Sequence, residues 1–324
     1  MIPFALLCAV TFTSCRKIDL TPLLKVATDS VADIGFTSCT LQGILLDPGA
    51  KNISNIGFFW GPNADFEKGS FVENVSVGSV KKGTRFVAQI QGLTPATTYF
   101  VTAYASADIE QVVGNTISFT TLDNHGTVVD IDGNSYQTVI IGSQEWMSEN
   151  LRTTKFNNGT EIPYISNDTV WNNLQSPGFS IYNHDSTTYR IPYGALYNWY
   201  TVNSGNLCPA GWHVPSSAEW QVLVDAAGGN SVAGSNLKET GTAHWSEPNV
   251  NATNQVGFTA LPGGHRRING TFEDLWYIGY WWSSTEEDTQ YAWQWSMSND
   301  VDFVENNGGY DKREGLSIRC VKDQ

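Results

Sequence analysis

Apolar and polar residues alternate in short runs along the first third of the chain. Five runs show a period of two: residues 39–45, 55–60, 85–90, 99–105 and 116–121. Turn residues such as Asp47-Pro48-Gly49 separate the runs. Alternation of this kind is typical of strands with one buried face, and several short strands with frequent turns are typical of a β-sandwich. We therefore predict a small β-sandwich over residues 27–121.

Two helices can be placed in the remainder of the chain. Ser216 and Glu219 match a capping box, which gives Glu219 a structural role. One helix face then carries Trp220, Leu223, Val224 and Ala227 before Gly228-Gly229 ends the helix. We predict a second helix over residues 194–202, where Leu196, Trp199 and Tyr200 share a face. Everything else after residue 122 is interpreted as short strands and long loops.

The distribution of tryptophan marks a domain boundary. Only Trp60 precedes residue 122, and the other eleven tryptophans follow it. We therefore expect one domain over residues 27–121 and a second over residues 122–324. A chain of 324 residues is long enough for both. Its 30 glycines and 41% apolar residues agree with a turn-rich, β-rich protein that has real cores.

The charge of the chain narrows its possible partners. Eighteen Lys and Arg stand against 32 Asp and Glu, which gives a net charge of −14 and argues against binding to nucleic-acid phosphates. No apolar run reaches the roughly 18–20 residues of a membrane-spanning helix. The aromatic content of 12% argues against a disordered chain.

The first residues resemble a bacterial lipoprotein signal. Residues 2–13 form a short apolar run, and Phe12-Thr13-Ser14-Cys15 is similar to a lipobox, with Phe12 where leucine is usual. This resemblance implies a signal peptide over residues 1–14, a lipidated Cys15 that anchors the protein to a membrane, and a tether over residues 15–26. The expected location is the outer membrane, facing the cell surface. The alternative is a plain apolar N-terminus.

Five cysteines occur, at positions 8, 15, 39, 208 and 320. Cys8 leaves with the signal peptide, and Cys15 carries lipid. Cys39 is in phase with the apolar residues of a strand, so we expect a buried free thiol. Cys208 and Cys320 remain, and an exported protein pairs its thiols, so we predict a disulfide between them. No cysteine and histidine cluster has the spacing of a zinc site.

Each of the two predicted domains resembles a known family. Leu93, Pro95, Thr97 and Tyr99 in residues 92–99 are similar to the corner motif of fibronectin type III-like domains, in which the tyrosine hydroxyl closes a corner. That resemblance implies a spacer or a binding module. In the second domain, the ordered motifs are Asp132-Gly133-Asn134-Ser135-Tyr136, Trp146-Met147-Ser148-Glu149-Asn150-Leu151, Leu196-Tyr197-Asn198-Trp199, Cys208-Pro209-Ala210-Gly211-Trp212-His213-Val214-Pro215, Glu219-Trp220, Gly257-Phe258 with Leu261-Pro262-Gly263-Gly264, Trp282-Ser283-Ser284 and Arg319-Cys320-Val321.

This second series resembles the Fibrobacter succinogenes major paralogous domain over residues 127–324. The resemblance implies an α+β fold similar to C-type lectins and formylglycine-generating (sulfatase-modifying-factor) enzymes, in exported lipoproteins of Bacteroidetes-like bacteria. Five tryptophans lie inside the motifs, and we expect them in the core: Trp146, Trp199, Trp212, Trp220 and Trp282.

The first functional hypothesis is a binding module for a protein or a glycan. Between Gly264 and Arg319, mixed charged, amide and aromatic residues interrupt the motif residues, as in interfaces built on a fixed frame. The candidate ligand-binding residues are Arg266, Arg267, Asp274, Trp276, Tyr277, Glu286, Glu287, Asp288, Gln294, Asn299, Asp300 and Glu305. The alternative is a structural surface lipoprotein that serves only as a spacer.

Two further hypotheses have less support from the residues. An oxidase like the formylglycine-generating enzymes needs two neighbouring cysteines for copper, and the predicted disulfide occupies Cys320. No G-x-S-x-G motif occurs, and His213 is expected to be packed, so we predict no catalysis and no cofactor. Glu247-Pro248-Asn249 matches a triplet of calcium-dependent lectins, although the partner W-N-D motif is absent. The Asp130–Asn134 run matches the start of a calcium loop, but Ile141 stands where glutamate is needed, which favours a hairpin turn.

Overall fold

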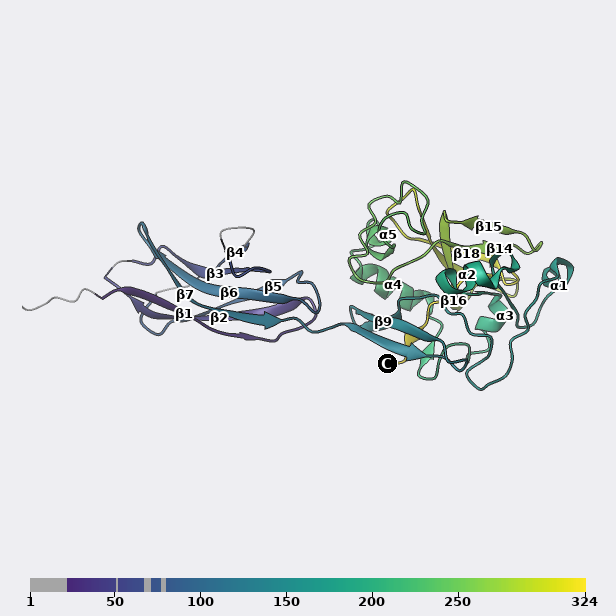
Figure 1. Ribbon diagram of the computed structural model, residues 1–324, viewed down its shortest axis with the longest axis horizontal. Helices are drawn as coiled ribbons and strands as arrows, with labels where there is room; N and C mark the ends of the chain where they lie inside the picture. Colours follow the sequence, from purple (N-terminus) through teal and green to yellow (C-terminus); the bar gives the residue numbers. More distant parts are fainter. Residues whose placement is uncertain (1–21, 51, 67–70, 77–79) are drawn as a thin grey trace, which may run out of the picture. The chain divides into compact units, whose positions relative to one another are not determined.

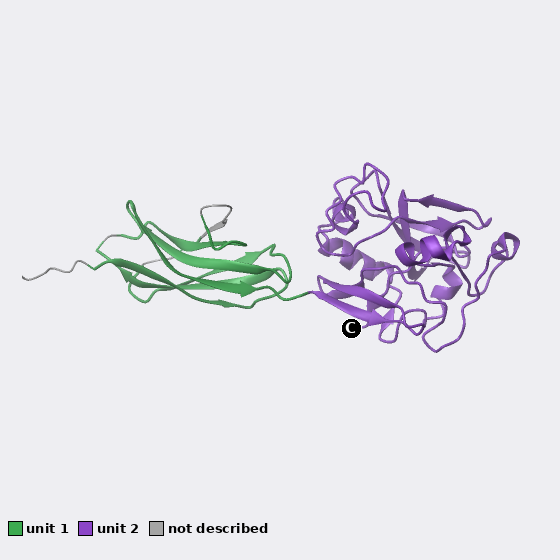
Figure 2. Cartoon of the chain, viewed as in Figure 1, with its two compact units in different colours: residues 1–123 green, residues 124–324 purple. Residues whose placement is uncertain are grey.

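A computed structural model describes residues 22–324 except residues 51, 67–70 and 77–79. The chain divides into two compact units, residues 1–123 and residues 124–324 (Figure 2). The predicted signal peptide and the predicted lipidation site at Cys15 lie outside the described residues. None of the helices in the described ranges is long and apolar enough to cross a membrane.

The first unit contains two antiparallel sheets (Figure 1). One has the strand order β1-β2-β5 and the other the order β4-β3-β6-β7. Phe86, Ala88 and Ile90 of β5 are buried while the residues between them are exposed, as the alternating pattern predicts. The bounds are β1 Leu24–Ala32, β2 Ser38–Pro48, β3 Asn55–Gly61, β4 Phe71–Asn74, β5 Arg85–Gln91, β6 Thr98–Ala107 and β7 Glu110–Thr120.

Both sheets of the first unit contribute to one hydrophobic core. Leu45, Phe58 and Val101 are fully buried in it. Cys39 belongs to the same cluster with a free thiol, which confirms its expected burial, and burial raises the pKa of this thiol to about 11. The hydroxyl of Tyr99 accepts a hydrogen bond from the backbone N–H of Thr94 at 3.0 Å. This bond ties the start of β6 to the loop before it.

The second unit is also β-rich, which confirms the coarse prediction of the fold class. Two five-stranded sheets have the orders β13-β19-β10-β9-β8 and β15-β14-β16-β17-β18, and β11 pairs with β12. The strand bounds are β8 His125–Val129, β9 Ser135–Ile141, β10 Gln144–Met147, β11 Phe179–Ser180, β12 Leu196–Tyr197, β13 Trp212–His213, β14 Gly263–Arg266, β15 Phe272–Leu275, β16 Ile278–Glu286, β17 Tyr291–Ser298, β18 Glu305–Asp311 and β19 Val321–Lys322. The helices are α1 Asp168–Asn172, η1 Tyr182–His184, α2 Ser186–Tyr193, α3 Trp199–Val202, α4 Ser217–Ala226 and α5 Ala233–Leu237.

One of the two predicted helices is confirmed and the other is wrong. The capping box of Ser216 and Glu219 begins α4 as expected. Of the predicted helix over residues 194–202, only α3 at its end forms, because Leu196 and Tyr197 pair with β11 instead. Asn198 then caps α3 by accepting a hydrogen bond from the backbone N–H of Thr201 at 3.1 Å. The apolar face of residues 194–202 therefore reflects burial of a strand and a short helix rather than one continuous helix.

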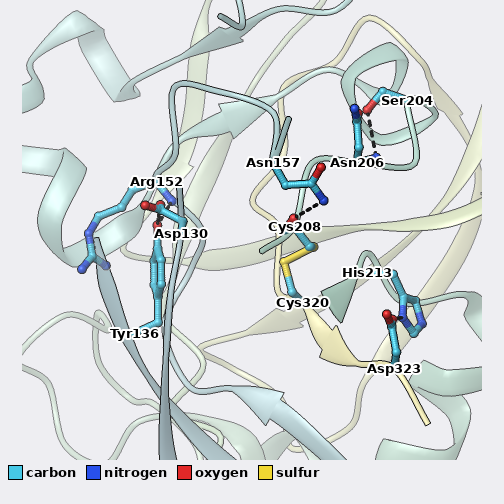
Figure 3. Close-up of a disulfide and its surroundings, with 10 residues drawn as sticks. All are labelled: Asp130, Tyr136, Arg152, Asn157, Ser204, Asn206, Cys208, His213, Cys320 and Asp323. Carbon is cyan, nitrogen blue, oxygen red and sulfur yellow. Dashed lines mark hydrogen bonds and ion pairs between the residues drawn. A yellow bond between two sulfur atoms is a disulfide. The ribbon is translucent and has the colours of Figure 1, made fainter. Parts of the chain in front are cut away.

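A disulfide joins two distant segments of the second unit. Cys208 and Cys320 are bonded with an S–S distance of 2.05 Å across a sequence separation of 112 residues (Figure 3). Both half-cystines are buried in the main hydrophobic cluster of this unit. The five tryptophans that we expected in the core are all buried, which confirms that prediction: Trp146, Trp199, Trp212, Trp220 and Trp282.

Next to the disulfide, the Arg319 side chain is fully buried. It donates to Asn150 Oδ1 at 2.8 Å and to the backbone oxygen of Thr259 at 2.7 Å. Its guanidinium lies 4.4 Å from the ring centre of Phe258. Burial lowers the pKa of Arg319 to about 9. These bonds connect the C-terminal segment with the loops around residues 150 and 259.

The Asp130–Asn134 run forms the hairpin turn between β8 and β9. Asp130 Oδ1 accepts from the backbone N–H groups of Asp132 at 3.0 Å and Asn134 at 2.9 Å. Its Oδ2 accepts from the Tyr136 hydroxyl at 2.6 Å (Figure 3). The carboxylate of Asp132 faces away from this turn and accepts from the Thr154 hydroxyl at 2.8 Å. The two aspartates therefore stabilise local backbone at separate places.

Candidate ligand-binding groove

The candidate site is built on the antiparallel pair β14 and β15. His265 is opposite Glu273 in the register, and Gly263 is opposite Leu275. The two strands approach so closely at Gly264 that a Cβ there would lie 2.3 Å from the backbone oxygen of Glu273. Gly264 also has a φ of +60°, which favours glycine. The Gly263-Gly264 pair therefore allows β15 to pack tightly and to present its far end at the surface.

The end of β15 and the turn that follows it hold two non-glycine residues in the left-handed region. Asp274 has a φ of +62° and Trp276 a φ of +72°. Backbone hydrogen bonds fix this geometry on both sides: Trp276 donates to Pro262 O at 3.0 Å, and its carbonyl accepts from Ser246 at 2.7 Å. Such a conformation costs of order 1–3 kcal/mol at each residue, and such residues cluster at ligand-binding and active sites. The conformation leaves the side chains of Trp276 and Tyr277 about half exposed.

An open groove of about 540 Å³ lies beside this turn. Its lining combines the segment Phe272–Tyr277 with Tyr182, Asn183 and Tyr189, which come from η1 and α2 some 90 positions earlier in the chain. In Figure 1, α2 lies close to β14, and η1, which precedes α2, contacts β14 and places Tyr182 against Phe272 of β15. We call this surface the aromatic groove.

Ring contacts hold the walls of the aromatic groove together. The ring centres of Tyr182 and Phe272 are 5.1 Å apart, and those of Tyr182 and Tyr189 are 5.5 Å apart. His184 meets Phe272 edge-on at 5.0 Å. The Trp276 indole is hydrogen-bonded to the hydroxyl of Tyr193, the last residue of α2. Segments that are distant in the sequence therefore form one packed aromatic wall.

A buried polar cluster lies behind the groove around His265. His265 is 1% exposed, and its ring stacks on Tyr280 with 4.6 Å between centres. Three carboxylates surround its nitrogens: Nδ1 lies 3.2 Å from Glu314, and Nε2 lies 3.5 Å from Asp274 and 4.0 Å from Glu273. Neither ring nitrogen makes a hydrogen bond to a described residue. The nearby carboxylates instead place negative charge around this ring.

Tyr280 fixes the position of the Asp274 carboxylate, because its hydroxyl donates a hydrogen bond to Asp274 Oδ2 at 2.9 Å. Burial, followed by the nearby Tyr310 and Asp274, raises the pKa of Tyr280 far above its ordinary value. The hydroxyl therefore stays protonated and remains a donor throughout the neutral range. Arg267 faces the same cluster at longer range, 3.8 Å from Glu273 and 3.9 Å from Glu314.

The structure brings only part of the predicted ligand-binding set to the groove. Asp274, Trp276 and Tyr277 line it, and Arg267 faces Glu273 at its edge. Asp300 follows β17 and accepts from the Ser298 hydroxyl, and Glu305 is exposed at the start of β18. Three other predicted residues lie at the far end of β16, away from the groove: Glu286, Glu287 and Asp288. Glu286 pairs with Lys312, and Glu287 accepts a hydrogen bond from the backbone N–H of Gly309. Asp288 accepts from the backbone N–H groups of Gln290 and Tyr291.

Three other members of the predicted set are buried, so their assignment as surface ligand contacts is wrong. Arg266 is fully buried: it pairs with Asp168 at 2.7 Å and lies 4.4 Å from the Trp171 ring centre. Gln294 is also fully buried. Asn299 is 7% exposed, and its amide donates to the backbone oxygens of Ser246 and Glu247. From the sequence, a charged or amide residue between motif residues is expected at the surface, whereas here Arg266 and Asn299 join internal segments and Gln294 lies in the interior.

Sequence reasoning did not find Tyr182, Asn183 and Tyr189. Tyr182 and Asn183 belong to η1, and Tyr189 belongs to α2. The carboxylate of Asp185 caps α2 by accepting from Thr187 at 3.0 Å and Thr188 at 3.1 Å. The Asp-Ser-Thr-Thr run is a recognisable N-cap signal. That signal could have located α2, but nothing local to it indicates packing against β15.

The other candidate motifs take structural positions. Within the triplet Glu247-Pro248-Asn249, the Asn249 side chain is buried and donates to the backbone oxygens of Glu239 and Gly241. His213 is half-exposed rather than packed as expected, and its Nε2 lies 2.8 Å from Glu219. Its Nδ1 lies 2.6 Å from Asp323 (Figure 3). Within the part of the chain that the structure describes, no group of three or more His, Cys, Asp and Glu side chains is arranged so that it could hold a metal ion.

Comparison with known proteins gives one family match. The Fibrobacter succinogenes major domain matches residues 139–322. No curated protein matches the chain. Among solved structures, a sensor domain of the anti-sigma factor RsgI4 of Pseudobacteroides cellulosolvens is 20% identical, over 31% of this chain and 95% of that one, with a TM-score of 0.25. A redesigned β-sandwich protein is 18% identical over 32% of this chain and 94% of its own, with a TM-score of 0.23. Scores this low carry no argument about architecture or function.

Proposed function

The chain belongs to the Fibrobacter succinogenes major domain family, and on that premise we propose that residues 124–324 are a ligand-binding module without catalytic activity. The ligand is a protein or a glycan, and its site is the aromatic groove. The observation that carries this proposal is the turn at Asp274 and Trp276, where left-handed backbone holds exposed aromatic side chains beside a groove of about 540 Å³. Half-exposed Trp and Tyr side chains on a rigid frame are the usual anchors of interfaces.

The two units have separate roles in this proposal. The first unit is a fibronectin type III-like sandwich that serves as a spacer, which is supported by its two sheets and by the bond from Thr94 N–H to the Tyr99 hydroxyl. The second unit has a fold similar to C-type lectins, and its short strands, short helices and long loops agree with such a frame.

The protein is exported and anchored to the outer membrane by lipid on Cys15, with the binding module at the cell surface. The Cys208–Cys320 disulfide supports an oxidising compartment, since such bonds persist mainly outside the cytosol. The lipobox-like segment that ends at Cys15 supports lipidation of this residue.

An array of glycans and proteins tests the binding role. The wild-type chain and the Trp276→Ala/Tyr277→Ala variant are applied in parallel, with Phe303→Ala as the control because Phe303 is 39% exposed in the same unit. We expect wild type and control to bind the same ligands and the double variant to lose them, because an aromatic hot spot contributes about 2–4 kcal/mol. Binding that survives in the double variant would refute the groove as the site. Absence of any bound ligand would favour the spacer alternative.

A further inference from the structure

The surface of the second unit is more acidic than its composition suggests. Residues 124–324 contain 22 Asp and Glu against 10 Lys and Arg. Five of these ten cations are buried: Arg152, Lys238, Arg266, Lys312 and Arg319. The buried cations make hydrogen bonds inside the unit. Lys238, for example, donates to the backbone oxygens of Ser298 at 2.9 Å and Val301 at 2.7 Å. The negative field at the surface is therefore opposed by few exposed positive charges.

The aromatic groove combines this negative charge with ring faces. Glu273 and Asp274 line it, with side chains that are 49% and 38% exposed. The nearest arginine, Arg267, forms a long ion pair with Glu273 at 3.8 Å, beyond hydrogen-bond distance. The exposed rings of Trp276 and Tyr277 lie beside these carboxylates in the same lining. Aromatic faces next to carboxylates form the environment that attracts an ammonium or guanidinium group.

We propose that the groove binds a lysine or arginine side chain, presented by an extended basic segment of a partner protein. This inference rests on the proposed binding function and specifies its ligand. The cation would lie against Trp276 or Tyr277 and pair with Asp274 or Glu273. A neutral glycan would desolvate both carboxylates without supplying an opposite charge, and burying an unpaired charge is costly. Because the turn is already fixed by backbone hydrogen bonds, little conformational entropy is lost on binding.

Titration calorimetry on the full chain tests this specificity with three defined probes. The first is a capped heptapeptide in which glycine alternates with lysine and arginine, the second is its glutamate counterpart, and the third is cellohexaose. We expect only the basic peptide to bind, and its affinity to fall at least tenfold between 20 mM and 500 mM NaCl because of screening.

Variants in which amides replace carboxylates locate the site. Glu273→Gln/Asp274→Asn removes both carboxylates of the groove, and asparagine tolerates the left-handed backbone at position 274. Asp225→Asn/Glu305→Gln changes the net charge equally at two exposed positions away from the groove lining. We expect the first pair to weaken binding of the basic peptide at least tenfold and the second pair to change it less than threefold. Near-UV circular dichroism checks that both variants stay folded.

The outcomes separate this inference from the binding function on which it rests. An equal loss of affinity for the basic peptide in the two double variants would overturn the inference, because it would assign the binding to diffuse surface charge. Binding of cellohexaose that disappears in Trp276→Ala/Tyr277→Ala, without binding of the basic peptide, would also overturn it and would leave the groove as a glycan site. If none of the probes binds, the cationic specificity is wrong, and the array result alone decides the binding function.

Discussion

Removal of the Cys208–Cys320 disulfide should destabilise the second unit without affecting the first. The bond closes a loop across 112 residues. Loop-closure entropy for this length corresponds to roughly 4–5 kcal/mol in the unfolded chain. A unit of this size loses about 2–4 °C of its unfolding midpoint for each kcal/mol. The double variant Cys208→Ala/Cys320→Ala should therefore unfold about 8–20 °C below wild type in residues 124–324.

Tryptophan fluorescence can follow this transition, because eleven of the twelve tryptophans lie after residue 122. Differential scanning calorimetry on the same samples records the first unit as well. Cys39→Ala is the matched control, since Cys39 is a buried free cysteine of the first unit. It should lower the midpoint of that unit only. A fluorescence midpoint that is the same in wild type, in the double variant and in reductant would refute the loop-closure argument.

Three further predictions follow from other parts of the molecule. Trp282→Ala should destabilise the second unit by about 3–5 kcal/mol, because Trp282 is fully buried. Trp276→Ala/Tyr277→Ala should lower the free energy of unfolding by only about 1 kcal/mol, and equal losses of the two variants in urea unfolding would place the groove aromatics in the core. Burial lowers the pKa of His213, but the hydrogen bonds that its ring makes to the carboxylates of Asp323 and Glu219 outweigh burial and raise the pKa above the ordinary value of 6.5. The stabilising effect of His213 is therefore complete below about pH 6.5 and is lost as the pH rises through the raised pKa, and this pH dependence in thermal unfolding should disappear in His213→Gln. Cys15→Ser should move the protein from the detergent phase to the aqueous phase in Triton X-114 partitioning, and a variant that stays in the detergent phase would contradict lipidation at Cys15.

The sequence predicted those parts of the fold that depend on local pattern. Alternation in residues 85–90 predicted β5, and the Ser216–Glu219 capping box predicted α4, because each signal lies within a few residues. The helix predicted over residues 194–202 failed because pairing of Leu196 and Tyr197 with β11 outweighs the local helical pattern. Pairing with a distant segment therefore decided the structure of residues 194–202.

The candidate site shows the same limit. Trp276 and Tyr277 could be selected from the sequence because exposed-looking aromatics interrupt a run of motif residues. Arg266 had the same appearance but is buried, because Asp168 and Trp171 from a distant segment pack against it. Tyr182 and Tyr189 reach the groove only through the packing of η1 and α2 against β14 and β15. No spacing within the chain encodes that contact.

Nitrogen-15 spectra of the tryptophan indoles test the groove most directly, because each of the twelve tryptophans gives one indole resonance. The measurement follows these resonances while the strongest-binding array ligand is added to the full chain. Trp276 is half-exposed in the groove, whereas Trp146, Trp220 and Trp282 are fully buried. A groove site predicts that the Trp276 resonance shifts in proportion to bound ligand while the buried tryptophans stay in place. An unchanged Trp276 resonance at saturation would contradict the assignment of the aromatic groove as the binding site.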